Sequence, residues 1–314
     1  MSSALSVLPE IVTPDPATGA TPATLMAWVK REHAAVTSRL RSSGALLFRG
    51  FGFAEFGDFQ GLVELFADNL TNYVGGASRR THVEGKVFTS TDTAAHYAIN
   101  QHHEGAYLPQ MPRIIGFFCQ VPAAKGGQTP LADGRRVLAR LPAELRARFE
   151  AKGVKYINNL PDRFGLGKSW QAQFQTEDRH AVEAVLRAEG YEFQWKSTGG
   201  LRTATRCPAV RAHPLTGERA WIAQADHWHP SGLEPGTRAR MAKTLAESEF
   251  PMNATYGDGT PFDEADLAAI REAIHAETVQ FDWQAGDVVV CDNFLVSHGR
   301  RPYEGERKVF VALG

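Results

Sequence analysis

The sequence predicts a mainly β protein with helices, whose core is a jelly roll of the double-stranded β-helix type. Two observations carry this prediction. Short apolar runs of strand length recur along the chain, notably at residues 114–119 and 288–291, between segments that contain turn residues. Helical patterns, by contrast, lie near the N-terminus and in segments that interrupt the strands. Strands that dominate the core, with helices added around them, are typical of a jelly roll.

The composition is that of an ordinary folded protein. The chain has 314 residues, a net charge of −1, 43% hydrophobic and 22% charged residues. This balance excludes disordered and fibrous classes. The near-zero net charge gives no general electrostatic basis for binding nucleic acid. Residues 1–314 are expected to form a single domain, because one β-rich core can reach this length.

The sequence also predicts where the protein works. Cys119, Cys207 and Cys291 lie far apart and form no C-x-x-C pair, so neither a disulfide framework nor a zinc ribbon is expected. No window approaches the roughly 20 apolar residues of a membrane helix. Residues 1–8 lack the basic and apolar regions of a secretory signal. We therefore expect a soluble cytoplasmic protein with no membrane partner.

The N-terminal elements follow from periodicity and from turn residues. Apolar positions at helical spacing predict a helix over residues 23–40, and Gly44 ends it. A buried strand is expected over residues 45–49 and a second helix over residues 56–66. The stretch 71–100 contains scattered Gly, Thr and Ser, which predicts loops and short strands lying over a site.

The middle of the chain alternates between strands and helices. Two strands are expected over residues 114–121 and 128–132, on either side of an Ala-Lys-Gly-Gly turn. A helix follows over residues 134–149, with Pro142 at a helix start or a break. Residues 155–202 mix a helix with polar loops and are predicted to be an insertion.

The C-terminal third returns to strands. Strand-like segments recur at residues 203–212 and 220–224. Thr260, Pro261 and Asp263 are N-terminal signals for a helix over residues 262–275. Three further strands are expected over residues 278–283, 287–292 and 308–313.

The strongest chemical signal is the segment His102-His103-Glu104. Side chains two residues apart on a strand point to the same face, so His102 and Glu104 can converge while His103 faces away. An imidazole and a carboxylate are two of the three ligands in the 2-His-1-carboxylate triad, which binds Fe(II) on one face and leaves the other open. An exposed His-His-Glu loop is the competing interpretation, since H-x-E also occurs by chance.

The remaining partners must come from elsewhere in the chain. His298 follows a buried strand, in the segment Val-Ser-His-Gly-Arg. Arg307 lies nine residues later, after a Pro-Tyr-Glu-Gly turn, and opens the last strand. A strand–turn–strand return would place its guanidinium beside His298, where it could hold a carboxylate through two parallel hydrogen bonds. Arg300 and Arg301 compete for this role by proximity alone.

Taken in order, the motifs resemble the TauD/TfdA taurine dioxygenase family of Fe(II)/2-oxoglutarate-dependent oxygenases. The motifs are H-x-E at 102–104, G-G-Q-T-P-L-A-D at 126–133, G-D-G at 257–259 and G-D-V-V-V-C-D-N-x-x-x-S-H-G-R at 286–300. The resemblance runs from about residue 45 to the last residue. It is nearest to the branch that includes clavaminate synthase and SyrP-like amino-acid hydroxylases.

The resemblance implies a role for each motif residue. His102, Glu104 and His298 correspond to the iron ligands, and Thr129 and Arg307 to the contacts with a 2-oxoglutarate carboxylate. The implied cofactors are Fe(II), 2-oxoglutarate and dioxygen, on a double-stranded β-helix. The Gly-Glu-Arg-Lys-Val context leads directly into a strand and favours Arg307 over Arg300. Related halogenases have a small residue in place of the carboxylate ligand, so Glu104 argues against halogenation.

A second metal pattern and a second class of function compete with this interpretation. His227, His229 and Glu234 approximate the cupin spacing H-x-H-x4-E. Residues 230–235, however, predict a loop that leads into a helix over 237–248, so Glu234 need not point where the histidines point. Either histidine would then line the pocket or cap that helix. A cupin-like metal protein or a non-catalytic binding protein on this scaffold is the alternative.

The substrate prediction rests mainly on the resemblance. We expect hydroxylation of an unactivated C–H bond in a small amino acid or related carboxylate, free or tethered to a carrier protein, with release of succinate and CO2. Gln224, His227 and His229 are candidate substrate contacts because they lie near the motif segments. A taurine-like sulfonate or an aryloxy acid is the alternative within the family.

Overall fold

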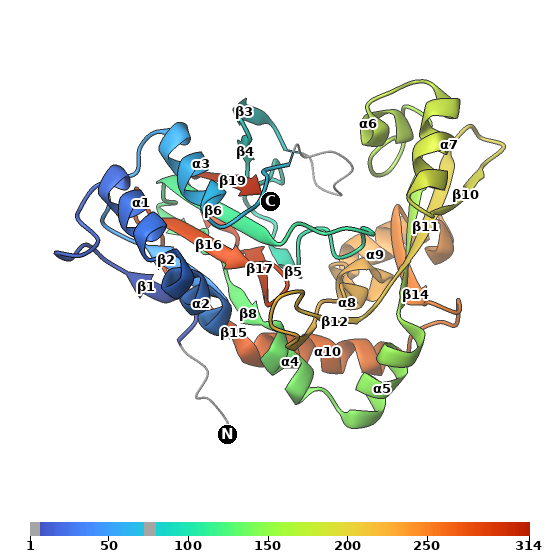
Figure 1. The fold of residues 1–314 in the computed structure, drawn as a ribbon. Helices are drawn as coiled ribbons and strands as arrows, with labels where there is room; N and C mark the ends of the chain where they lie inside the picture. The colour runs from blue at the N-terminus through green and yellow to red at the C-terminus, as the bar shows by residue number, and fades with distance from the viewer. Residues whose placement is uncertain (1–6, 72–79) are drawn as a thin grey trace.

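The structure, a computed structural model, describes residues 7–71 and 80–314. Over these residues it combines sheets and helices, as the sequence predicts in outline (Figure 1). The part of the expected loop region 71–100 that covers residues 72–79 lies outside the described residues. Within the described ranges, no helix is both long and apolar enough to cross a membrane.

The N-terminal helices form one layer of the molecule. α1 (Pro22–Arg31) and α2 (His33–Ser43) replace the single helix expected over residues 23–40, because the backbone leaves the helical conformation at the residue between them. Gly44 ends α2 with a φ of 83°, a conformation that glycine adopts without steric cost. The third helix of this layer is α3 (Phe56–Glu64).

A large sheet lies against these helices. Counted over the described residues it has seven strands, in the order β1 (Glu10–Val12), β2 (Ala45–Phe48), β16 (Val288–Asp292), β6 (Ile114–Val121), β19 (Lys308–Leu313), β4 (Val87–Thr89) and β3 (His82–Glu84). Leu25 of α1, Phe59 of α3 and Phe118 of β6 belong to one buried cluster. The central strands are almost entirely apolar because both of their faces are covered.

The other face of the large sheet packs against a smaller sheet. Its strand order is β15 (Thr278–Val279), β8 (Leu131–Asp133), β17 (Val296–Arg300) and β5 (Ile99–His102). Ile115 and Val289 of the large sheet share a buried cluster with Leu131 and Val296 of the small sheet. The two sheets therefore enclose one apolar layer, and β5 and β17 carry two of the predicted metal ligands, His102 and His298.

Two further helices contact β8 of the small sheet: α4 (Gly134–Arg140) and α10 (Glu264–Glu277). The helix expected over residues 134–149 is divided at Pro142 into α4 (Gly134–Arg140) and α5 (Ala143–Lys152). α10 (Glu264–Glu277) begins slightly later than expected because Asp263 is its N-cap, accepting a hydrogen bond from the backbone N–H of Ala265 at 2.9 Å.

The predicted insertion contains more β structure than expected. Three of its strands join β14 from later in the chain in a second four-stranded sheet, in the order β10 (Glu192–Trp195), β11 (Leu201–Cys207), β9 (Val154–Leu160) and β14 (Met252–Tyr256). α6 (Trp170–Phe174) and α7 (Arg179–Ala188) pack on it through a separate small core. We call residues 154–207 the arm; its helices lie at the opposite end of the molecule from α1–α3 (Figure 1).

Short elements complete the fold. They are β7 (Lys125–Gly126), β12 (Val210–Ala212), β13 (Arg219–Trp221), β18 (Tyr303–Glu304), α8 (Ala225–Trp228), α9 (Pro235–Ala242) and 3-10 turns at Pro230–Gly232 and Glu247–Glu249. The helix expected over residues 237–248 is therefore shorter than predicted. The antiparallel pair β7–β18 is the one nearest the site, because Arg307 follows the turn at the end of β18.

Candidate metal centre

Three side chains converge at the paired strands β5 and β17. His102 and His298 stand directly opposite each other in this antiparallel pair, with ring centroids 4.4 Å apart. Glu104 follows the end of β5, and its Oε2 lies 3.9 Å from the Nε2 of each histidine. One ligand atom from each residue lies within 4.8 Å of the other two. No other group of this kind occurs among the described residues.

A buried asparagine fixes the backbone of the carboxylate residue. The Asn293 amide accepts a hydrogen bond from the Glu104 backbone N–H and donates one to the Glu104 carbonyl, both at 2.8 Å. His103 turns away from the triad, and its Nδ1 lies 2.7 Å from the Asn293 carbonyl. Asn293 lies within the motif at 286–300, but nothing in its sequence context indicates this contact with Glu104.

The protonation states of the histidines suit a metal ion. Burial lowers the pKa of His102, and it lowers the pKa of His298 well below the usual value. The His102 Nδ1 lies 2.8 Å from the Asn100 carbonyl, which can only accept, so this nitrogen carries the proton. The Nε2 lone pair of His102 therefore faces Glu104. Two neutral imidazoles and a carboxylate are donors that fit Fe(II).

The structure adds an arginine that the sequence analysis missed. Arg80 has a side chain that is only 3% exposed, and its Nη2 donates to Glu104 Oε2, the oxygen that faces both histidines. Arg80 also lines a cavity of about 30 Å³ together with Arg300 and Arg307. It follows the stretch 72–79 in a region with no readable sequence pattern, so no signal pointed to it.

The arginine predicted to bind 2-oxoglutarate lies beside the predicted threonine. The Arg307 Nε donates to the Gly127 carbonyl at 2.9 Å, and its Nη2 is 3.5 Å from Thr129 Oγ1. The indole N–H of Trp283 donates to the same hydroxyl at 3.1 Å. Burial, followed by the nearby charge of Arg300, lowers the pKa of Arg307 to about 10. This cationic pocket favours an anion.

The two rival arginines are engaged elsewhere. Arg300 donates to the backbone carbonyls of Thr93 and Ala94 at 2.7 Å and of Tyr97 at 2.9 Å, so it holds the loop over the site. The Arg301 Nε donates to Gln280 at 3.2 Å. These contacts leave Arg307 as the better candidate for a carboxylate.

The three predicted substrate contacts lie in different environments. The His227 ring stacks beside His102, with centroids 6.0 Å apart, and burial lowers its pKa to about 4. The Gln224 amide donates to the His103 carbonyl and accepts from the Trp228 indole at 3.1 Å, so it already has partners. His229 accepts from the backbone N–H of Ser231 at 3.2 Å and caps a 3-10 turn. Of the three, His227 lies nearest the metal ligands.

The cupin-like pattern does not form a metal cluster in the described part of the chain. Glu234 is instead the N-cap of α9, accepting hydrogen bonds from the backbone N–H groups of Gly236 and Thr237 at 2.9 and 2.8 Å. Its carboxylate is therefore used by the helix. This agrees with the expected loop before that helix and removes the structural basis for a cupin site.

Facing sheets and a largely buried His-Glu-His group are typical of a non-haem iron oxygenase. The model of the taurine catabolism dioxygenase TauD, TfdA family matches residues 10–313, and the chain belongs to that family. It is a dioxygenase whose cofactors are Fe(II) and 2-oxoglutarate, as the sequence analysis predicts from the resemblance.

Named relatives support the branch within the family. The chain is 38% identical to the dapdiamide synthesis protein DdaC of Enterobacter agglomerans over 281 residues, which cover 90% of this chain and 85% of DdaC. It is 30% identical to a clavaminate synthase-like protein of Arabidopsis thaliana over 297 residues, 91% of this chain and 86% of that protein. The crystal structure of PvcB from Pseudomonas aeruginosa shares the fold, with a TM-score of 0.54, 17% identity and coverage of 96% and 84%.

Proposed function

We propose that His102, Glu104 and His298 bind one Fe(II) and that the enzyme hydroxylates a C–H bond of a small amino acid or a related carboxylate, free or tethered to a carrier. The convergence of the three ligand atoms within 4.8 Å carries the metal assignment. The similarity to DdaC, which is named for the synthesis of dapdiamide, supports an amino-acid-derived substrate. Taurine-like sulfonates and aryloxy acids are the competing substrates.

The co-substrate site follows from the same geometry. We infer that Arg307, with Thr129 beside it, binds the distal carboxylate of 2-oxoglutarate, because this buried guanidinium has no carboxylate partner among the described residues and therefore favours an anionic ligand. Held by these residues, iron and 2-oxoglutarate would supply the activation of dioxygen, with one oxygen atom passing to succinate as CO2 is lost and the other to the hydroxyl group of the product.

Other residues of this chain position the proposed metal ligands and the substrate. Asn293 holds the Glu104 backbone from both sides, and the Asn100 carbonyl fixes the tautomer of His102. His227, stacked beside His102, is the candidate contact to the substrate among the three predicted residues. Its pKa of about 4 keeps its ring neutral at physiological pH, so it acts through hydrogen bonding and packing rather than through charge.

Three broader assignments accompany this function. We infer that the two facing sheets form a double-stranded β-helix, supported by the shared apolar layer between them. We treat residues 1–314 as one oxygenase domain in which the arm is the insertion. A cytoplasmic location is supported by three buried, free cysteines, Cys119, Cys207 and Cys291, which suit a reducing compartment.

The neighbouring histidines His102 and His103 offer a matched test of the metal assignment. His102→Gln removes a proposed ligand, whereas His103→Gln changes a buried histidine that points away from the triad. Co(II) binding, followed by visible absorption, should be lost in His102→Gln and retained in His103→Gln. Equal binding by both variants would contradict the triad. Glu104→Gln should likewise lose metal binding and iron-dependent turnover.

A substrate panel separates the family alternatives. The purified enzyme with Fe(II) and 2-oxoglutarate would be given free amino acids, aminoacyl thioesters on a carrier protein, taurine and aryloxyacetates. Succinate release coupled to a hydroxylated product should occur with an amino-acid-derived substrate. Coupled turnover with taurine or an aryloxyacetate alone would place the enzyme in another branch.

A further inference from the structure

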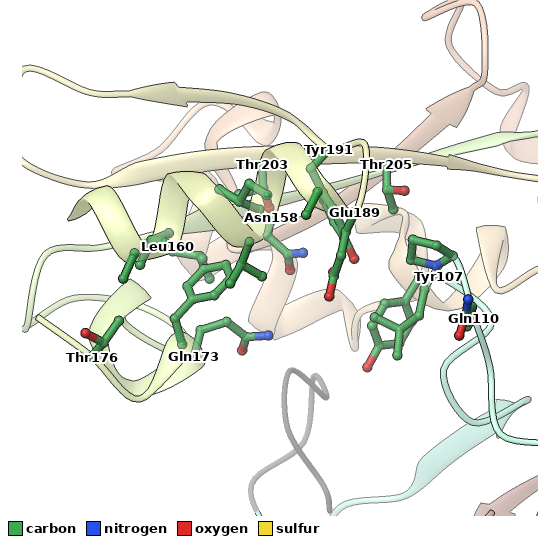
Figure 2. Close-up of a pocket in the computed structure, with 18 of the residues that line it drawn as sticks. Tyr107, Gln110, Asn158, Leu160, Gln173, Thr176, Glu189, Tyr191, Thr203 and Thr205 are labelled. Carbon is green, nitrogen blue, oxygen red and sulfur yellow. The ribbon is translucent and has the colours of Figure 1, made fainter. Parts of the chain in front are cut away.

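A large cavity lies between the arm and the segment that follows the metal ligands. Its volume is about 680 Å³, and its walls come from β9, β11 and α7 of the arm and from the loop at Tyr107–Gln110. Figure 2 shows Tyr107 and Gln110 at one end of the cavity and Leu160 and Thr176 at the other, with Asn158 and Glu189 between them. The cavity is therefore elongated along the arm.

The Tyr107 end of the cavity adjoins the metal centre. Tyr107 lies three residues after Glu104, so their Cα atoms are at most about 11 Å apart. The Tyr107 ring contacts Trp228, with centroids 4.9 Å apart. Trp228 follows His227, whose ring stacks beside His102. A molecule that reaches from the metal centre past this pair of rings would enter the cavity.

The lining of the cavity has a definite chemical character. Hydroxyl and amide groups of Gln110, Asn158, Thr203 and Thr205 lie along it, with aliphatic side chains of α7 between them. Among the described lining residues there is one carboxylate, Glu189, and no lysine, arginine or histidine. Amide and hydroxyl side chains both donate and accept hydrogen bonds, so they suit neutral amides.

This character contrasts with the small cavity beside the metal ligands. Arg80, Arg300 and Arg307 line that cavity and provide its positive charge. A carboxylate would therefore be favoured beside the metal ligands and disfavoured in the arm cavity, where its desolvation would find no cation. The small cavity therefore suits an anionic group of a ligand, and the arm cavity suits a neutral one.

The size of the arm cavity points to a substrate longer than a free amino acid. Cavities of roughly 300–1,000 Å³ enclose ligands of drug size, and this one lies within that range at about 680 Å³. A small amino acid bound at the metal centre would leave it empty. The space fits a chain of several amide-linked units attached to the group that is oxidised.

We propose that the arm cavity binds a neutral, amide-bearing chain of the substrate, while the reacting carbon lies at the metal centre. This rests on the proposed oxygenase function and deepens it by naming the substrate class. Two sources share this chemistry. One is a peptide-like small molecule with amide bonds, and the other is the pantetheine arm of a carrier protein, which also consists of amides and hydroxyls.

Calorimetry with three probes tests the proposal. Pantetheine, N-acetylalanine methylamide and free alanine would be titrated, without oxygen, into enzyme loaded with Mn(II) and 2-oxoglutarate. We expect one or both amide probes to bind. Thr203→Val and Asn158→Leu should weaken that binding about 5- to 10-fold, the usual effect of losing one neutral hydrogen bond. Thr203→Val preserves side-chain shape, so it remains informative if Asn158→Leu folds poorly.

A control on the other side of the arm sets the baseline. Gln194→Leu, like Asn158→Leu, replaces an amide side chain by leucine, but Gln194 lies on β10 and lines a separate cavity. This variant should leave probe binding unchanged. Equal affinities in all variants, an equal loss in all of them, or no binding of either amide probe would overturn the proposal. Stronger binding of pantetheine would identify the carrier arm, and stronger binding of the methylamide a peptide-like molecule.

The same samples separate this inference from the proposed function. Mn(II) and 2-oxoglutarate binding would be measured before each titration. Failure of the unsubstituted enzyme to bind Mn(II) would contradict the proposed metal site formed by His102, Glu104 and His298. Normal metal and co-substrate binding without any binding of an amide probe would count against the arm cavity alone.

Discussion

Arg80 donates a hydrogen bond to the Glu104 oxygen that also faces the Nε2 atoms of His102 and His298. A buried guanidinium thus stands beside the position where the three proposed ligands would share a cation. The adjoining cavity of about 30 Å³ is too small for a molecule of the size of 2-oxoglutarate unless a lining side chain moves. Arg80 is one of those side chains, so metal and co-substrate binding should both depend on its position.

Replacing Arg80 by methionine should therefore tighten metal binding in the absence of 2-oxoglutarate. A divalent ion competes with the guanidinium for Glu104, and a charge-assisted hydrogen bond contributes enough for a change of roughly 10-fold. Co(II) titration of Arg80→Met would measure it. Arg49→Met is the control, since Arg49 pairs with Asp287 instead. Weaker or unchanged Co(II) binding in Arg80→Met would show that the two cations do not compete.

Replacing Asn293 by alanine should weaken metal binding as well as lower the stability of the fold. Its amide makes two hydrogen bonds to the Glu104 backbone, and removing such an outer partner of a metal ligand lowers metal affinity about 10- to 100-fold. Asn159→Ala is a matched control, because the Asn159 amide likewise makes two hydrogen bonds to the backbone, at 3.0 and 2.8 Å, but to carbonyls that belong to no proposed metal ligand. We expect both variants to be less stable and only Asn293→Ala to bind Co(II) weakly. Normal Co(II) affinity of Asn293→Ala would exclude this role.

The sequence predicts those parts of the fold and site that depend on local pattern. The strand at Ile114–Val121 has the expected bounds because its apolar run is continuous, and Pro142 divides a helix because proline cannot continue one. His102 and Glu104 converge, as the spacing of two on a strand suggests, although Glu104 lies just beyond the end of β5.

Contacts between residues that are far apart in the sequence cannot be predicted from local patterns. The register that places His298 opposite His102 depends on pairing between strands that are almost two hundred residues apart in the sequence. Arg80 contacts the Glu104 carboxylate and Asn293 contacts the Glu104 backbone, and neither kind of contact leaves a periodic pattern in the sequence. The sheet that includes the strands of the predicted insertion was missed for the same reason, since β9 pairs with β14, nearly a hundred residues later and outside the insertion.

Arg307 and Arg300 should have different effects on co-substrate binding. Arg307→Ala removes the guanidinium beside Thr129 and should weaken 2-oxoglutarate binding by roughly 2–3 kcal/mol, or about 30- to 150-fold. Arg300→Ala should instead loosen the loop at Thr93–Tyr97, whose carbonyls Arg300 holds. Calorimetric titration of 2-oxoglutarate into metal-loaded protein distinguishes them. The large loss appearing in Arg300→Ala and not in Arg307→Ala would reverse the assignment.

Asp226 should make stability depend on pH in an unusual direction. Its side chain is buried, one carboxylate oxygen has no hydrogen-bond partner among the described residues, and burial raises its pKa to about 6 despite the opposing charge of Arg271. The unfolded chain releases this proton near the ordinary value of 3.8. Between about pH 4 and 6 the folded state binds more protons than the unfolded state, so the contribution of Asp226 to stability falls as the pH rises.

Asp226→Asn removes this titration with little change in shape. The variant should match the wild type near pH 4 and exceed its free energy of unfolding at pH 7 by up to about 3 kcal/mol. Urea unfolding at pH 4, 5, 6 and 7 would measure the difference. His103 and His227, whose pKa values burial lowers to about 4, titrate in both proteins and cancel in the comparison. A variant that is less stable at pH 7, or a difference that does not shrink toward pH 4, would mean that Asp226 is ionised in the folded protein at a normal pKa.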